Sequence, residues 1–520
     1  MTSRIAVVLA LVAGTATASA VTVTGNVKWT DSAGGTHNAR RVRYVVIEEN
    51  PILGSVVAGA GRTDLDGNYS EAVTFRPGYT GYAVIVLADN DAGFVASDGT
   101  AANTYSIFGG FRHVLDPSTH IDTTIDNGTP NGRAFSIADA MYTSWRFGLS
   151  GRAADPTPAP APVACAYPVA GTVPYFNGIL NIVAGGENDW DTAMHEYSHY
   201  LSSLDPLDNE PGGPHTWGTS NIPGLGKGPG MRLGWGEGFA NWAGIAAQHH
   251  DPVGGHTPAG VPNVGDTRYD DTVQGFWVNL ETRAASWGND DGQGEGDELS
   301  VCRILWDLGD AANEGYDRVA LGHDMLYRRL RAVSIADASS PSGFRGVETL
   351  HDVWMDLAGG ATITIAGLVD MGAIFEQHKV SPSPLDDFVT TPIMVTGGAP
   401  TFSWLRQNNG ENDTFEIKIL AGDLSDILLT ITVPTSTSTY TLTDAQWDAL
   451  KALPLGAYQY SIVGGDRLVG MFGAVRPAAD QTLGYWSGSY GLTLLPTPGA
   501  ATLLGLGMLV VRVRRGRSEA

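Results

Sequence analysis

The hydrophobic pattern divides the chain into three stretches of different periodicity. From residue 21 to 125, short apolar runs alternate with polar residues and are separated by Gly, Asp and Asn. A period of two is typical of β-strands, and strands are expected at Val21–Val27, Val42–Glu48 and Tyr82–Leu87. The first stretch therefore predicts a small β-sandwich over residues 21–125.

Residues 126–383 change to the spacing of amphipathic helices, with one candidate strand at 176–183. The alternating pattern returns over residues 384–493. The chain is thus predicted to be multidomain, with an α+β domain at 126–383 flanked by two all-β sandwich domains. The expected helices are Ala134–Phe147, Asp189–Leu204, Glu237–Gln248, Glu298–Leu308 and His323–Val333.

The two ends carry patterns of their own. Residues 1–20 combine Arg4, a short apolar run and the small residues Ala18-Ser19-Ala20, which predicts a cleavable signal peptide. Residues 494–520 run from a polar stretch through an apolar segment to several arginines, which predicts a short membrane segment with a basic stop. We therefore expect a secreted or envelope-associated protein, anchored by this tail before or without processing.

Charge and cysteine content narrow the partners. A formal net charge of -24 argues against nucleic acid, because phosphate binding needs clustered Lys and Arg. The two cysteines exclude a thiolate zinc cluster, which needs several ligands at close spacing. An exported environment permits one disulfide between Cys165 and Cys302, and two buried free thiols fit the sequence equally well.

The segment His195-Glu196-Tyr197-Ser198-His199 carries the candidate chemistry. On a helix, histidines at i and i+4 project from one face and can bind one zinc ion together. Glu196 lies beside them and is placed to act as general base toward a zinc-bound water. The segment predicts one zinc ion per chain and peptide-bond hydrolysis.

The best third ligand is Glu237, in the segment Gly234-Trp-Gly-Glu237-Gly-Phe-Ala-Asn241. Here the chain resembles the gluzincin, thermolysin-like metallopeptidases. The resemblance implies that Glu237 binds zinc and that Asn241, four residues later, accepts a hydrogen bond from a ligand histidine. That group has Asp at this position, so Asn implies a less basic histidine.

Two other third ligands remain open. Asp205 follows the histidines at a spacing close to that of the metzincins, although Ser202 stands where that group needs Gly. His215 lies in a Gly/Pro-rich loop, where a histidine is more often simply exposed.

Stabilisation of the transition state needs a further hydrogen-bond donor. Candidates in the same domain are Tyr269, Tyr316, His323 and Tyr327, and the sequence does not choose among them. Glu298 opens a predicted helix, where it either lies near the site or stabilises the helix N-terminus.

Three further resemblances concern the flanking segments. Residues 61–69 resemble a turn of transthyretin-like or carboxypeptidase-regulatory-like modules, in which Asp64 and Asp66 either bind Ca2+ or stabilise the turn. Residues 384–493 resemble a fibronectin type III or immunoglobulin-like sandwich. The tail resembles a PEP-CTERM sorting signal, with Pro496-Thr497-Pro498 in place of Pro-Glu-Pro, and implies an exosortase-type processing partner.

Together these features predict an exported zinc metallopeptidase that hydrolyses protein or peptide substrates. The alternative from another class is an inactive zincin-like protein with an adhesive or matrix-interaction role in the cell envelope. Retention of the complete set of ligands and base favours the enzyme.

Overall fold

The computed structural model describes most of the chain between residues 20 and 495. The signal peptide predicted over residues 1–20 lies outside the described residues except for Ala20, and the sorting tail lies outside them from residue 496 onward. The boundary predicted at 383/384 also falls in a segment that is not described. The internal residues left out are 51, 117, 153–157, 208, 216, 218–226, 251–260, 262–263, 290–293, 295, 312–317, 339–346, 348, 360–363, 379–392, 405–413, 434–438 and 466–484.

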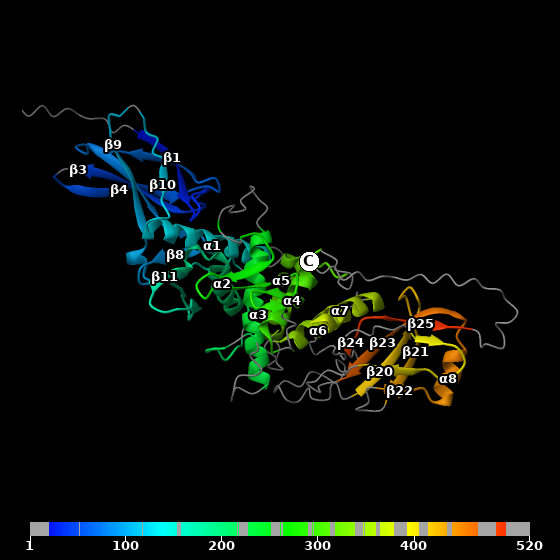
Figure 1. The fold of residues 1–520 in the computed structure, drawn as a ribbon. Coiled ribbons are helices and arrows are strands. Elements are labelled where there is room, and N and C mark those ends of the chain that lie inside the picture. The colour runs from blue at the N-terminus through cyan, green and yellow to red at the C-terminus, as the bar shows by residue number, and fades with distance from the viewer. Residues whose placement is uncertain are drawn as a thin grey trace, which may run out of the picture.

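The described chain is a mixed α/β protein with several separate sheets and eight α-helices (Figure 1). N-terminal strands, a helical middle region and a C-terminal sheet follow one another along the chain (Figure 1). The prediction of a multidomain protein that mixes helices and sheets is confirmed at this level.

The N-terminal strands form two four-stranded sheets, one ordered β10-β1-β2 with β5 also on β1, the other ordered β4-β3-β6-β9. Tyr44 of β3 and Tyr69 of β5 connect the sheets, since their ring centroids lie 4.9 Å apart. The strands are β1 (Ala20–Thr30), β2 (Thr36–Asn38), β3 (Arg43–Asn50), β4 (Gly54–Arg62), β5 (Asn68–Thr74), β6 (Gly81–Leu87), β9 (Ser106–His113) and β10 (Thr123–Ile125).

The turn between β4 and β5 uses its aspartate as a structural group. Asp64 Oδ1 accepts hydrogen bonds from the backbone N–H of Asp66 at 2.9 Å and of Asn68 at 2.8 Å. Gly67 has a φ of +79°, which a side chain would strain. Asp64 therefore holds the turn, and neither Asp64 nor Asp66 belongs to a group of described residues that can bind a metal ion.

A third sheet joins the N-terminal strands to the helical region. Its order is β12-β13-β11-β8-β7, and β8 (Gly93–Ala96) runs parallel to β11 (Val163–Val169). The remaining strands of this sheet are β7 (Asp89–Asn90), β12 (Tyr175–Phe176) and β13 (Leu180–Val183), which comes just before the histidine-bearing helix. Two strands from within residues 21–125, β7 and β8, thus complete a sheet of the helical region. One hydrophobic core runs continuously from Val23 through the helical region.

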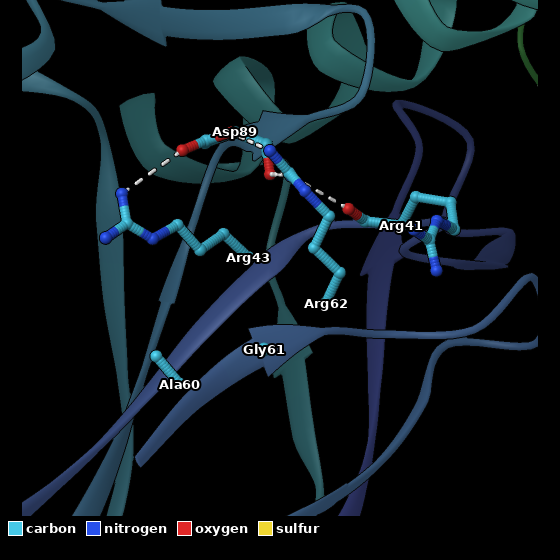
Figure 2. A pocket seen from close by; sticks show the side chains of 6 residues that line it. All are labelled: Arg41, Arg43, Ala60, Gly61, Arg62 and Asp89. Carbon is cyan, nitrogen blue, oxygen red and sulfur yellow. Dashed lines mark hydrogen bonds and ion pairs between the residues drawn. The ribbon is translucent and has the colours of Figure 1, made fainter. Parts of the chain in front are cut away.

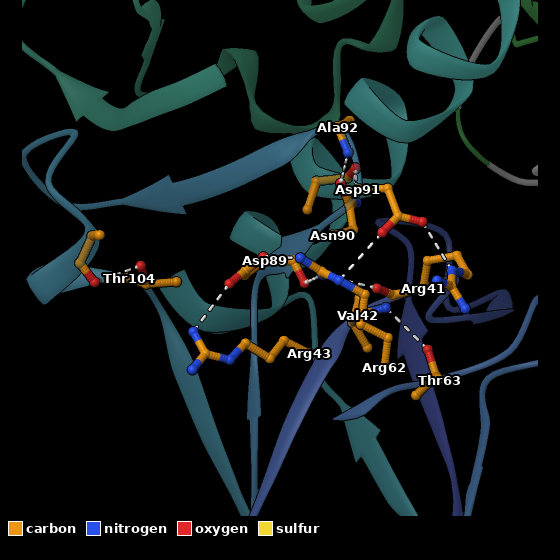
Figure 3. A network of polar contacts seen from close by, with 12 residues as sticks. Arg41, Val42, Arg43, Arg62, Thr63, Asp89, Asn90, Asp91, Ala92 and Thr104 are labelled. Atoms are coloured by element: carbon orange, nitrogen blue, oxygen red, sulfur yellow. Dashed lines mark hydrogen bonds and ion pairs between the residues drawn. The ribbon is translucent and has the colours of Figure 1, made fainter. Parts of the chain in front are cut away.

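An ionic network holds the start of this sheet against the N-terminal strands (Figure 3). Arg62 donates to the carbonyl of Asp89 at 2.8 Å and to its carboxylate at 2.9 Å. Arg41 donates to Asp91 at 2.9 Å. The same arginines line a pocket together with Arg43, which reaches Asp89 only at 3.5 Å (Figure 2).

All five predicted helices form, and the described structure adds three that the pattern did not predict. Four of the five end within about five residues of the expected positions, whereas α3 begins at Lys227, ten residues before the expected Glu237. α1 begins at Pro130 with Thr129 as its N-cap, whose side chain accepts from the N–H of Gly132. The helices are α1 (Pro130–Ser150), α2 (Trp190–Leu204), α3 (Lys227–His250), α4 (Glu298–Gly309), α5 (His323–Ala338), α6 (Leu350–Gly359), α7 (Ile365–Gln377) and α8 (Asp444–Lys451). A small sheet of β14 (Arg268–Asp271), β15 (Phe276–Asn279), β16 (Ala284–Ala285) and β17 (Gly288–Asn289) lies between α3 and α4 in sequence.

The C-terminal region has a core of its own. Its main sheet has the order β18-β25-β23-β20-β21, with β24 on β23, and β19 pairs with β22 separately. Glu376 of α7 joins this sheet to the helices, because its carboxylate accepts from the N–H of Gly488 at 2.9 Å and from the hydroxyl of Tyr490. The strands are β18 (Ile393–Val395), β19 (Thr401–Ser403), β20 (Thr414–Leu420), β21 (Ile427–Val433), β22 (Thr439–Thr441), β23 (Gly456–Gly465), β24 (Tyr485–Trp486) and β25 (Tyr490–Leu494).

No helix in the described part of the chain is both long and apolar enough to cross a bilayer. The membrane segment predicted within residues 494–520 lies outside that part from residue 496 onward. Cys165 in β11 and Cys302 in α4 are separate buried thiols, so of the two alternatives the structure has the one without a disulfide. Burial raises the pKa of both thiols well above the ordinary value, which keeps them protonated and unreactive.

Candidate metal centre

Helix α2 presents its two histidines on one buried face. Asp189 caps the helix by accepting from the N–H of Thr192 at 3.0 Å. Trp190 fixes its start against α1 by donating to Ser136 at 3.0 Å. His195 and His199 lie one turn further on, with ring centroids 4.7 Å apart.

Helix α3 brings Glu237 to these histidines through a close helix approach. A Cβ added at Gly244 would lie 3.2 Å from the backbone nitrogen of His195, so α2 and α3 meet almost backbone to backbone there. On another face of α3, a Cβ added at Gly238 would lie 2.6 Å from the carbonyl oxygen of Glu298 in α4. The small residues of α3 therefore allow three helices to converge at Glu237.

His195, His199 and Glu237, here called the primary triad, direct three ligand atoms at one point. The two Nε2 atoms are 3.1 Å apart, and Glu237 Oε2 lies 3.2 Å from that of His195 and 3.4 Å from that of His199. All three side chains are buried. This group can hold a metal ion.

The spacing fits a small tetrahedral ion. Bonds of about 2.0–2.1 Å to nitrogen and oxygen in a tetrahedral site separate ligand atoms by roughly 3.3–3.4 Å. The distances within the primary triad are 3.1 to 3.4 Å. The donor set of two imidazoles and one carboxylate is also one that zinc accepts and that leaves a fourth position open.

Asn241 orients the first histidine. His195 Nδ1 lies 2.8 Å from Asn241 Oδ1, and the amide oxygen can only accept, so the proton sits on Nδ1. The lone pair of the neutral ring is then on Nε2, which faces the triad. His199 Nδ1 is a buried nitrogen without a hydrogen-bond partner in the described structure, and Glu210 Oε1 lies 3.9 Å from it.

The charged groups of the site shift one another's pKa values. Burial by itself would raise the pKa of Glu237, but the charge and hydrogen bonds of His199 and His195 hold it well below its ordinary value. Burial would lower the pKa of His199, yet the negative charge of Glu237 raises it well above its ordinary value. The buried carboxylate of Glu237 thus stays negatively charged beside the two imidazoles. This is an environment that favours a bound cation.

Glu196 is buried beside the triad and interacts electrostatically with both of its histidines. Burial raises the pKa of this carboxyl group, and the nearby His195 and His199 limit the rise. A carboxylate with a raised pKa is a better proton acceptor near neutral pH.

Asp205 is not part of this site. It ends α2, and its carboxylate accepts from Arg152 at 2.7 Å, from Arg331 at 2.7 Å and from the hydroxyl of Tyr327 at 2.6 Å. With two guanidinium groups and a phenol bound, it serves as the centre of a buried ionic network. Asp205, the third ligand in the metzincin-like alternative, is therefore engaged in this ionic network and not in the group of His195 and His199.

His215 does reach the site, together with Glu298. His215 Nε2 lies 3.6 Å from Glu237 Oε1 and 3.9 Å from Glu298 Oε2. These three residues, here called the second triad, also form a group that can hold a metal ion. Sequence reasoning named both His215 and Glu298 but did not connect them, because nothing in the chain links a loop histidine to a helix start more than eighty residues away.

Of the three candidate donors that the structure describes, only Tyr269 lies at the site. Its ring centroid is 5.7 Å from that of His195, and burial raises the pKa of its hydroxyl well above the ordinary value, so the group stays a donor. His323 instead accepts from Trp242 at 3.3 Å and packs on Trp306, and Tyr327 is bound to Asp205. Tyr316 lies outside the described residues.

Comparison with known proteins adds little to this geometry. No protein-family model matches the chain, and no curated protein matches it. Weak likenesses exist to solved structures of a 9R-lipoxygenase from Cyanothece PCC8801 (14% identity, 27% of this chain and 25% of that one, TM-score 0.14) and of the plantain pollen allergen Pla l 1 (11% identity, 21% and 92%, TM-score 0.16). A third is an (S)-allantoin synthase (14% identity, 20% and 41%, TM-score 0.14). This chain therefore spans about a quarter of the lipoxygenase, and scores this low do not indicate a shared fold.

Proposed function

We propose that the chain is a zinc-dependent endopeptidase with a zincin-type catalytic domain of the gluzincin kind. The observation that carries the proposal is the convergence of the primary triad, with ligand atoms 3.1 to 3.4 Å apart, next to the buried carboxylate of Glu196. The sequence order of two helix histidines, an adjacent glutamate and a glutamate on a second helix is the order that this class of peptidase uses.

The primary triad would hold one zinc ion. When bound, such an ion supplies Lewis-acid chemistry, which polarises the scissile carbonyl and makes a water molecule at the open position more acidic. Asn241 would keep the His195 lone pair directed at the triad by accepting a hydrogen bond from Nδ1–H.

The protein's own groups then handle the proton and the developing charge. Glu196 takes the proton from the attacking water and returns it to the leaving amine, a role that its raised pKa favours. Tyr269, whose ring centroid lies 5.7 Å from that of His195, would donate to the reacting carbonyl oxygen, and burial raises the pKa of its hydroxyl so that the group stays protonated.

The test pairs metal content with hydrolysis of casein. Glu196→Gln should reduce turnover by at least about 10²-fold, because a general base is lost, while zinc content stays unchanged. His199→Ala should lose zinc from the primary triad as well as activity. Glu48→Gln, at a glutamate buried in β3 far along the chain from the site, is the matched control and should keep both properties.

Full activity in Glu196→Gln would rule out the mechanism. Zinc at normal affinity in the wild-type chain without hydrolysis of any unfolded protein would instead favour the inactive, adhesive alternative.

A further inference from the structure

The carboxylate of Glu237 faces two different sets of partners. Its Oε2 atom lies 3.2 Å from His195 and 3.4 Å from His199, in the primary triad. Its Oε1 atom lies 3.6 Å from His215. One ion in the primary triad therefore leaves the second oxygen directed at another histidine.

The tautomer of His215 makes this arrangement unusual. Its Nδ1 atom lies 3.0 Å from the carbonyl oxygen of Gly213, which can only accept, so the proton is on Nδ1. In the neutral ring, the Nε2 lone pair then points at the oxygens of Glu237 and Glu298. A lone pair opposite two carboxylates is repulsive unless a cation lies between them or the ring takes up a second proton at Nε2.

Glu298 has no other role in the described structure. Stabilisation of the N-terminus of α4 is already supplied by Asp297, which accepts from the N–H groups of Leu299 at 2.9 Å and Ser300 at 3.2 Å. The Glu298 side chain is only 6% exposed. Within the described part of the chain its carboxylate accepts no hydrogen bond, and its one ionic partner is His215 at 3.9 Å.

The loop that carries His215 is held in place. The carbonyl of Trp217 accepts from the N–H of Glu298 at 3.0 Å, which ties this loop to the start of α4. Trp217 also packs against Phe276 and Trp287, with ring centroids 5.1 and 5.9 Å away. The position of His215 opposite Glu298 is thus supported by the contacts of Trp217, two residues further along the loop.

We propose that His215, Glu298 and the Oε1 atom of Glu237 bind a second divalent transition-metal ion, so that one carboxylate bridges two ions. The ligand atoms of this second triad lie within 4.8 Å of one another. One imidazole and two carboxylates suit Zn2+ or Mn2+ better than a softer ion. Carboxylate-bridged pairs of ions about 3.5–4 Å apart occur in hydrolases, including aminopeptidases.

The inference rests on the proposed function in that the first ion occupies the primary triad. The test is titration of the metal-free full-length chain with Zn2+, followed by isothermal calorimetry and by elemental analysis after dialysis. The wild-type chain is expected to bind two ions. His215→Ala and Glu298→Gln should each bind one, with the affinity of the remaining site changed by less than about 3-fold.

Both variants are suited to the test. His215 lies on an exposed loop, and Gln has the shape of Glu, so circular dichroism should show an unchanged fold. His120→Ala removes an exposed histidine that pairs with Asp122 in the N-terminal region, and this control should still bind two ions.

Each other outcome overturns the proposal. A wild-type chain that binds one zinc ion and hydrolyses casein has no second site, although the proposed function stands. If the two variants then raise KM for peptides without changing zinc content, the second triad binds substrate instead. Two ions retained in both variants would place the second ion elsewhere, and no zinc in the wild type would remove the proposed function as well.

Discussion

Asn241 is hydrogen-bonded to the ring of His195 and orients it. Its amide oxygen accepts from Nδ1 at 2.8 Å inside the protein. In Asn241→Ala the ring loses this partner and can rotate or move its proton to Nε2, so we expect zinc affinity to fall about 10- to 100-fold. Asn241→Asp keeps the acceptor and adds a negative charge, and should bind zinc at least as tightly as the wild type. Competition with a chromophoric chelator measures both affinities.

The control is Asn127→Ala, which removes another buried asparagine, one that donates to Asn188 at 2.9 Å. Its zinc affinity should match that of the wild type. An Asn241→Ala chain with wild-type affinity would show that the hydrogen bond does not orient the ligand.

Part of the site could be predicted from the sequence because its residues lie close together in the chain. His195 and His199 are four residues apart, and helix geometry alone puts them on one face. The role of Asp205 was not accessible in this way, because its partners Arg152 and Arg331 lie 53 and 126 residues away in the chain. The pairing of His215 with Glu298 depends on tertiary packing in the same manner.

At the scale of elements, the contact of α2 with α3 sets the distance between the ligands. A Cβ at Gly244 would meet His195 N at 3.2 Å and the Met194 carbonyl carbon at 3.3 Å. In Gly244→Ala this crowding opposes a gain in helix propensity of about 1 kcal/mol, so the net change in unfolding free energy should be small. Gly244→Val should cost about 1–3 kcal/mol through overpacking and should also weaken zinc binding.

Denaturant unfolding and zinc titration on both variants check this ranking. A valine variant as stable as the wild type and with normal zinc affinity would mean that the helices are not closely packed at Gly244.

A second element-scale prediction concerns the ionic network of Figures 2 and 3. Arg62 donates to the backbone of Arg41 at 3.1 Å and to Asp89 twice, so it joins β4 to β7, an edge strand of the third sheet. Because its side chain is 29% exposed, we expect Arg62→Ala to lower the unfolding free energy by about 1–2 kcal/mol. Arg43→Ala is the control, since its side chain is 50% exposed and reaches Asp89 only at 3.5 Å, and should cost less than about 0.5 kcal/mol. Equal losses in the two variants would contradict this account.

Helices and local hairpins followed the periodicity of the sequence more closely than the sheets did. The helix predicted from Asp189 begins at Trp190 because Asp189 is its cap. The parallel pairing of β8 with β11 joins residues about seventy positions apart, and no period or turn signal in the chain indicates such a partner. Sequence therefore predicted where strands form better than which strands pair.

At the scale of the whole molecule, the distribution of the core determines which parts should unfold together. The N-terminal strands share one hydrophobic core with the metal-binding helices, to which Leu420 of β20 and Val463 of β23 also contribute. The rest of the C-terminal sheet encloses a second core. Binding of an ion to the native state stabilises only the cooperative unit that contains its ligands. The metal is therefore a probe for the division of the chain into units.

We expect removal of zinc to loosen the N-terminal strands as well as the helices. Free zinc at about 100 times its Kd stabilises the native state by about 2.7 kcal/mol, and a chelator removes that stabilisation. In hydrogen exchange read by mass spectrometry, peptides from α2, α3 and β1 should all exchange faster without zinc, because they share a core. Peptides from β18 and β19 should keep their rates, since Val395 and Phe402 pack in the separate C-terminal core. If α2 is affected and β1 is not, the shared core does not unfold as one unit, and the N-terminal strands form an independent domain despite their contacts with α1 and β11.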